Sequence, residues 1–137
     1  MMDLQAAFRA RLVANTTINS LTGGRVAWGG RPQGTALPAI VLTKAAPGQD
    51  WTHGGTDGLI RPWVQFDIWS ATYPSGAAIA VAVQSEMQRL TDVTAGGWVF
   101  KAPGELVGDQ WPGPEDLPGG GTAYRVIQDY RFWAQPA

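Results

Sequence analysis

Two segments of the sequence, Ile60–Ala71 and Ala123–Ala134, have the pattern of long β-strands with large side chains on both faces. One parity of each segment is an ordinary apolar face, formed by Ile60, Val64, Phe66 and Ile68 in the first and by Tyr124, Val126, Tyr130 and Phe132 in the second. The other parity mixes tryptophan with charge, through Arg61, Trp63, Gln65, Asp67 and Trp69 in the first and Arg125, Ile127, Asp129, Arg131 and Trp133 in the second. Successive side chains on a strand point to opposite faces, so one core cannot take both sets.

Helical spacing appears in two other segments. Asp3–Ala14 predicts an amphipathic helix with Asp3 as its N-cap and an apolar stripe formed by Leu4, Phe8 and Leu12. A second helix is predicted to begin at Tyr73, where Pro74 and Ser75 suit the first positions. Its apolar stripe is Ile79, Val83, Met87 and Leu90, so we expect it to reach Leu90.

Shorter apolar runs predict the remaining strands. They are Val26–Trp28, Ala39–Ala45 and Gly96–Ala102, the last with Trp98 and Phe100 on one side. Glycine and proline concentrate between these runs, in Gly23–Pro38, Pro47–Gly58 and Pro103–Gly121, and such clusters mark long connections. We expect Ala39–Ala45 and the strand from Ile60 to form an antiparallel hairpin whose extended tip is Gly48–Gly58.

This order of elements predicts one α+β domain over residues 1–137, a mainly antiparallel four- to five-stranded sheet with two helices packed on one face and long Gly/Pro-rich loops. The other sheet face would carry Trp63, Trp69 and Trp133. Three buried aromatic side chains remove roughly 450–750 Å² from water, as much as the largest apolar patch of a typical monomer. We therefore predict that another chain covers this face. The alternative is that the chain's own loop Pro103–Gly121 lies across it.

Composition excludes several classes of function. The formal net charge is -1 and no basic run occurs, which argues against electrostatic capture of nucleic acid or of an anionic membrane. Without cysteine there is no disulfide and no thiol nucleophile. The N-terminal segment lacks the apolar stretch of a secretory signal, and no apolar run approaches the length of a membrane span, so we expect a soluble domain made in the cytoplasm.

Candidate catalytic and metal-binding residues are sparse. The single histidine, His53, lies in a Gly-rich segment with Asp50 and Asp57, but their spacing fits no calcium loop. The acidic group Asp109, Glu115 and Asp116 likewise lacks ligand spacing, and no phosphate-binding glycine motif or nucleophile elbow is present. We expect no enzymatic activity, no metal and no cofactor.

The charges of the mixed face have two interpretations. If the two long strands are neighbours, Asp67 and Asp129 can pair with Arg125 and Arg131 across the sheet, which is worth a few tenths of a kcal/mol for solvated pairs. Alternatively, these charges lie within a contact between subunits, where Arg and Trp are favoured anchors. The sequence leaves both interpretations open.

Several segments together resemble a known family. They are GGRVAWGGRPQG (Gly23–Gly34), LPAIVL (Leu37–Leu42), DGLIRPWVQFDIWSATYP (Asp57–Pro74) with the helix that follows, and YRVIQDYRFW (Tyr124–Trp133). In this order, with the leading helix, the chain resembles the tail terminators of long-tailed phages, also called tail-completion or head–tail joining proteins, which occur in phages, prophages and gene transfer agents. Pro103–Gly121 matches no part of that pattern.

The resemblance implies a structural virion protein located at the head–tail junction. Tail terminators assemble as a hexameric ring on the tail tube, stop its growth and join it to the head-side connector or stopper protein, while DNA passes through the lumen without specific binding. The implied partners are other copies of this chain, the tail tube protein and the connector, with no membrane. A ring contact needs two different patches on each subunit.

Two sets of residues are candidates for these contacts. The predicted subunit interface is formed by Trp63, Asp67, Trp69, Arg125, Asp129, Arg131 and Trp133. The predicted contact with a neighbouring ring or with the lumen is formed by Gln49, Asp50, Trp51, His53 and Asp57. The alternatives are another neck or tail component, such as a stopper or tube subunit, and a soluble α+β module that binds or converts a ligand at the loop-lined end of the sheet.

Overall fold

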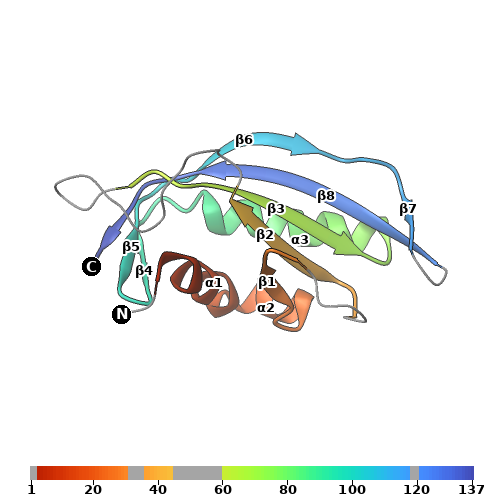
Figure 1. Cartoon of the computed structure of the whole chain (residues 1–137), viewed down its shortest axis with the longest axis horizontal. Coiled ribbons are helices and arrows are strands. Elements are labelled where there is room, and N and C mark those ends of the chain that lie inside the picture. Colours follow the sequence, from red (N-terminus) through yellow and green to blue (C-terminus); the bar gives the residue numbers. More distant parts are fainter. Residues whose placement is uncertain (1–2, 31–35, 45–59, 118–120) are drawn as a thin grey trace.

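The computed structural model describes residues 3–30, 36–44, 60–117 and 121–137. The helices are α1 (Leu4–Ala14), α2 (Thr16–Thr22) and α3 (Tyr73–Met87). The strands are β1 (Val26–Trp28), β2 (Ala39–Lys44), β3 (Trp63–Ser70), β4 (Val93–Ala95), β5 (Trp98–Phe100), β6 (Glu105–Gln110), β7 (Glu115–Asp116), β8 (Thr122–Arg131) and β9 (Ala134–Pro136). The predicted α+β class is confirmed (Figure 1).

The main sheet is mostly antiparallel, as predicted. Its strands follow the order β1-β2-β3-β8-β6, and β7 continues beside β8. Among the strand pairs of the described residues, β1–β2 is the parallel one and the others are antiparallel. β2 and β3 form the expected antiparallel pair. Over the described ranges the sheet has six strands where four or five were expected, because the segment after Pro103 forms strands. β5 lies outside this sheet and pairs with β4 and β9 in a second, three-stranded sheet.

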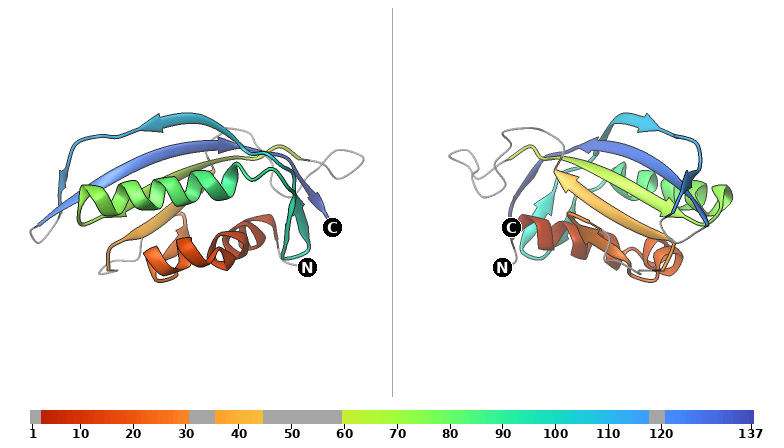
Figure 2. Two further views of the ribbon diagram at one scale, coloured as in Figure 1. Left: turned by 180° about the vertical axis from the view of Figure 1, so that it is seen from behind. Right: turned by 45° about the vertical axis from the view of Figure 1, so that its right-hand side comes forward.

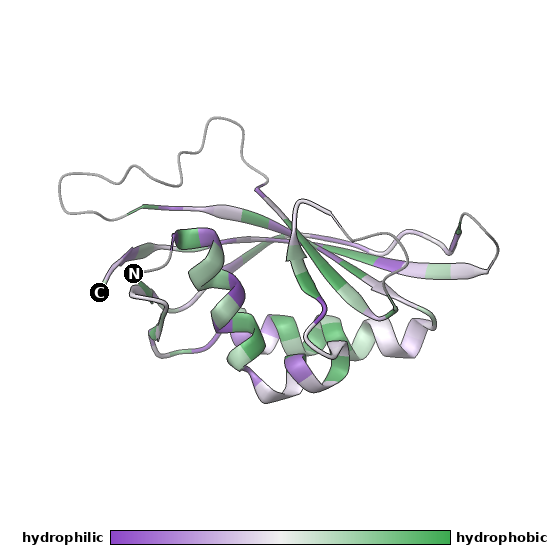
Figure 3. Ribbon diagram, turned by 60° about the horizontal axis from the view of Figure 1, so that its bottom comes forward, coloured by the Kyte–Doolittle hydropathy of each residue, from purple (hydrophilic) through white to green (hydrophobic). Residues whose placement is uncertain are grey.

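The helices lie on one side of the main sheet. Figure 1 shows α1 and α2 beneath the β1–β2 side, and Figure 2 shows α3 beneath β8 from behind. Hydrophobic segments of the helices and of the central strands meet in this layer (Figure 3). The core there contains Phe8, Phe66, Phe100, Tyr130 and Phe132, all buried. The apolar parity predicted for both long strands is therefore the core-facing one.

Local sequence signals fix the starts of the long helices. The Asp3 carboxylate accepts a hydrogen bond from the Ala6 amide at 2.8 Å, which confirms the predicted N-cap of α1. Thr72 caps α3 in the same way through the Ser75 amide, at 3.3 Å, and Pro74 lies in the first turn.

Two helix predictions need correction. Residues 16–22, which lie outside both predicted helices, form α2, with Asn15 as N-cap and Gly23 as a left-handed C-cap at φ 63°. α3 ends at Met87, and Leu90 is exposed and takes no part in its apolar stripe. The helix ends there because the Gly104 amide donates to the Met87 carbonyl at 2.7 Å, where the next helical turn would continue.

Candidate subunit interface

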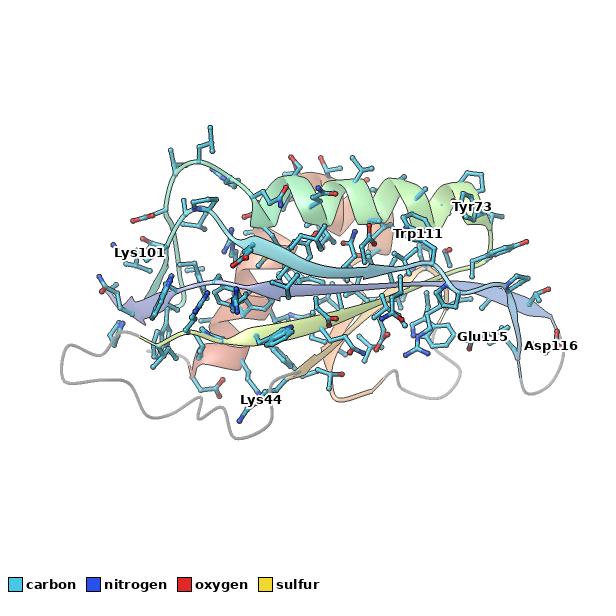
Figure 4. The ribbon with its side chains drawn as sticks, turned by 90° about the horizontal axis from the view of Figure 1, so that it is seen from above. Lys44, Tyr73, Lys101, Trp111, Glu115 and Asp116 are labelled. Atoms are coloured by element: carbon cyan, nitrogen blue, oxygen red, sulfur yellow. The ribbon has the colours of Figure 1, made fainter. Side chains whose placement is uncertain are left out.

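The side chains of the main sheet that point away from the helices form one surface, which we call the outer face. Figure 4 looks onto it, with the strands in front of the helices. β3 and β8 are antiparallel neighbours, and their register places Trp63 opposite Arg131, Asp67 opposite Ile127 and Trp69 opposite Arg125. The outer face is defined by Trp63, Gln65, Asp67 and Trp69 of β3 and Arg125, Ile127, Asp129 and Arg131 of β8.

Arg125 is at the centre of the first group of contacts on the outer face. Its Nη2 lies 2.8 Å from Asp67 Oδ1, and its Nε donates to the same oxygen at 3.0 Å. Gln65 Nε2 donates to the other oxygen of Asp67 at 3.3 Å. The Arg125 guanidinium also lies over the Trp69 ring, 5.1 Å from its centre. The predicted pairing of opposite charges across the two strands is thus confirmed for Arg125 and Asp67.

A second group of contacts lies at the other end of the outer face. Arg131 Nη2 is 2.9 Å from Glu105 Oε2, and Arg61 Nη2 is 3.7 Å from the same oxygen. The Arg61 guanidinium in turn lies 5.2 Å from the centre of the Trp133 ring. Because the Glu105 side chain is 57% exposed, its ion pairs contribute little to folding, about 0–1 kcal/mol each.

On the outer face, Trp63 Nε1 and Asp129 Oδ1 are buried without a hydrogen-bond partner among the described residues. Burial raises the pKa of the Asp129 carboxyl above its ordinary value, and the nearby Asp67 carboxylate raises it further. β6 approaches this carboxylate closely, since a Cβ atom at Gly108 would lie 2.8 Å from Asp129 Oδ2. Unsatisfied buried groups of this kind are rare in folded chains.

The tryptophans of the outer face are less exposed than the sequence predicted. Trp63 and Trp69 are half-buried, and Trp133, just beyond the end of β8, is 43% exposed. Arg125 covers part of Trp69, which a parity argument does not reveal. The apolar patch is therefore smaller than the sum of three whole rings.

The segment predicted to be a loop after Pro103 lies beside the sheet. β6 pairs with β8 from Glu105 to Gln110, with a bulge between Leu106 and Gly108, and β7 pairs with β8 further along. These strands widen the sheet instead of crossing the outer face. They also bring Glu105 and Glu115 to the arginines of β8, at 2.9 Å from Arg131 and 3.7 Å from Arg125. The sequence assigned neither glutamate to these contacts, because a Gly/Pro-rich segment predicts a loop and not a strand.

The second set of predicted contact residues lies outside the described residues. It is the inter-ring or lumen set, Gln49, Asp50, Trp51, His53 and Asp57. Within the described ranges, no group of three His, Cys, Asp or Glu side chains could hold a metal ion. No helix in these ranges is long and apolar enough to cross a membrane.

Comparison with known proteins identifies the family. The family model described as tail completion protein gp17 matches residues 6–135, nearly the whole chain. This chain belongs to that family. The resemblance to tail-completion proteins seen in the sequence is therefore confirmed, and the chain is a structural component of a phage-type tail.

Solved structures share the fold of this tail completion protein. A chain from the virion of a native gene transfer agent particle aligns with a TM-score of 0.60 and 19% identity, over 97% of this chain and 95% of that one. A second solved structure aligns with a TM-score of 0.52 and 16% identity, over 94% and 92% of the two chains. No curated protein matches the chain. At these identities the likeness establishes a common architecture for this tail protein.

Proposed function

We propose that this tail completion protein forms a hexameric ring at the head-proximal end of the tail. The ring ends growth of the tail tube and offers a docking surface to the head-side connector or stopper, and DNA passes through its lumen. Membership of the tail completion family supports a role in finishing the tail. The formal net charge of -1 is compatible with a channel that lets DNA pass without holding it.

The observation that carries the proposal is the composition of the outer face. It presents Trp69, Trp63 and the nearby Trp133 together with arginine, the residue types that anchor protein–protein contacts. Trp63 Nε1 and Asp129 Oδ1 have no hydrogen-bond partner among the described residues, so a neighbouring chain can supply what the subunit lacks. Faces that combine exposed apolar surface with polar groups favour assembly over isolation.

The predicted interface residues take different parts in this proposal. Arg125 and Asp67 already pair within the subunit, so they hold Trp69 in place. Arg131 and Trp133 lie at the more exposed end and take part in the contact between subunits.

The experiment combines the purified protein with polymerising tail tube protein. Native mass measurement and sedimentation give the number of subunits on the tube end, and electron microscopy gives tube lengths. We expect hexamers and tubes of arrested length, in proportion to the amount of protein added. A chain that incorporates along the whole tube is a tube subunit, and one that binds only the connector is a stopper; either result overturns the terminator proposal.

A further inference from the structure

The two long edges of the main sheet differ in charge and in shape. Residues 102–121 contain Glu105, Asp109, Glu115 and Asp116 but no lysine or arginine. The four acidic residues lie within β6 and β7, the last described strands of the sheet on that side. Asp109 and Asp116 are exposed and form no ion pair with the described residues. We call β6, β7 and these four residues the acidic edge.

An exposed aromatic cluster adjoins the acidic edge. Trp111 follows β6 directly and lies 5.5 Å from the ring centre of Tyr73, which lies 6.2 Å from Tyr124. Tyr73 is 56% exposed and Trp111 is 40% exposed. Trp111 Nε1 donates to Asp109 Oδ1 at 3.0 Å, so the indole is held beside the carboxylate. A fixed tryptophan next to an acidic group is suited to anchor a protein–protein contact.

The opposite edge of the sheet is basic. It consists of β1 and the end of β2 with Lys44, together with Arg25 just before β1 and Arg9 of α1, and we call it the basic edge. Figure 4 shows Lys44 on the β2 side and Trp111 and Tyr73 on the β6 side of the same sheet. Arg9 Nε donates to the Val26 carbonyl at 2.6 Å and Arg25 Nε to the Pro38 carbonyl at 2.8 Å. These partners are neutral, and no carboxylate of the described residues pairs with either arginine or with Lys44.

The basic edge also contains an open cleft. It has a volume of about 300 Å³ and is lined by Gln5, Trp28, Gly29, Leu42, Thr43 and Lys44. Trp28 supplies partly exposed apolar surface, and Lys44 supplies a positive charge at the same site. An aromatic side chain that carries a carboxylate beside it matches both features.

We propose that the acidic edge of one copy docks onto the basic edge of the next copy, with Trp111 entering the cleft beside Lys44. The inference rests on the proposed ring and names the contact that repeats around it. Pairing two acidic edges or two basic edges would place like charges together, so the contact joins unlike edges. A contact between unlike patches is heterologous and closes into a ring when its rotation permits. The acidic edge adjoins the outer face, since Glu105 and Glu115 bind its arginines.

Charge reversal with mixing tests this contact. The variant Asp109→Lys/Asp116→Lys reverses the acidic edge, and Arg9→Glu/Lys44→Glu reverses the basic edge. Each variant alone brings like charges together, and we expect its apparent assembly affinity to fall at least about tenfold at low salt. An equal mixture restores unlike charges at every contact by alternating the two variants, so we expect assembly within about threefold of wild type. Sedimentation in the presence of tail tube protein measures the assembled fraction.

Controls separate folding from docking. Thr94→Lys adds charge on the small sheet and is expected to assemble normally, and thermal unfolding confirms that each variant is folded. If Arg9→Glu/Lys44→Glu does not fold, Lys44→Glu alone replaces it. Trp111→Ala should weaken assembly about tenfold, whereas Leu90→Ala, which removes an exposed side chain outside both edges, should not.

The outcomes distinguish this inference from the proposed function. The edge contact alone is overturned if the wild-type protein assembles but the folded charge-reversal variants assemble equally well. It is also overturned if the mixture of the two variants does not recover assembly. Wild-type protein that never assembles on the tail tube overturns both the ring and the edge contact.

Discussion

Arg11 and Glu86 form a buried ion pair that joins α1 to α3. Arg11 Nε lies 2.9 Å from Glu86 Oε2, and Arg11 Nη2 donates to the Glu86 carbonyl at 2.8 Å. Asn15 Nδ2 donates to the other carboxylate oxygen at 2.8 Å, and the Arg11 guanidinium lies 5.4 Å from the centre of the Phe100 ring. Desolvation lowers the pKa of Arg11, and the hydrogen bond and charge of Glu86 oppose that shift.

Breaking this pair should be costly. Arg11→Met leaves the Glu86 carboxylate buried without its ion pair to the Arg11 guanidinium. We therefore expect a loss of about 3–5 kcal/mol in the free energy of unfolding, measured with urea. Arg89→Met removes a half-exposed partner of the same carboxylate, 3.4 Å away, and is expected to cost less than about 1 kcal/mol. The double variant Arg11→Met/Glu86→Leu should recover most of the loss, because apolar residues can replace a buried pair. Equal losses for the two single variants would contradict a special role for Arg11.

Asp129 should make the stability depend on pH. Its pKa is raised in the folded chain, so the folded state holds this proton more tightly than the unfolded state does. The stability that this tighter proton binding gives the folded state is present at low pH and is lost as pH rises through the folded pKa. We therefore expect Asp129→Asn to be more stable than wild type at pH 7, with a gain that disappears as pH falls below the ordinary value of 3.8.

Asp92 provides the control for that experiment, with the opposite sign. Hydrogen bonds from the Ala102 amide, at 2.8 Å, and from Lys101 lower its pKa. The ionised Asp92 carboxylate therefore stabilises the folded state at neutral pH, and this stabilisation is lost as pH falls through the lowered pKa. Asp92→Asn should be less stable than wild type at pH 7. Thermal unfolding across the pH series compares both variants; shifts of the same sign would show that the two carboxylates are not in opposite environments.

A side chain at Gly76 should destabilise the fold. It is buried where α3 approaches the sheet, and a Cβ atom there would lie 2.7 Å from Ser70 Oγ. We expect Gly76→Ala to lower the free energy of unfolding by about 1–3 kcal/mol through overpacking, although alanine is the better helix former. Ser70→Ala in the same chain should relieve the clash. Gly113→Ala, where nothing lies within 4 Å, should leave stability unchanged.

The outer face should matter more for assembly than for folding. We expect Trp69→Ala and Arg131→Glu to reduce ring formation on the tail tube about tenfold or more, with modest losses of stability. Arg131 is suitable because its partner Glu105 is 57% exposed, so the pair stabilises the isolated subunit little. Sedimentation of the folded variants measures the effect. Intact rings of normal size would exclude the outer face from the subunit contact.

The elements that the sequence predicted well are those with regular local patterns. Leu4, Phe8 and Leu12 identify α1, and Val64, Phe66 and Ile68 identify the core side of β3, and all six are buried. α2 was missed because its sequence, TTINSLT, is rich in residues of low helix propensity, and its caps and packing stabilise it instead. β6 was missed because a Gly/Pro-rich segment is typical of a loop, while pairing with β8 makes it a strand.

The candidate interface likewise has one part that local patterns predict and another that depends on the tertiary structure. Parity along two strands determined that Trp63, Asp67, Trp69, Arg125, Asp129 and Arg131 share one face, since alternation on a strand is a local property of the backbone. Only the tertiary structure decided the partner of each charge: Arg125 binds Asp67, whereas Arg131 binds Glu105 from a strand that joins the sheet through long-range pairing. The burial of Asp129 and the contrast between the two sheet edges likewise depend on the order of the strands, and local patterns do not encode that order.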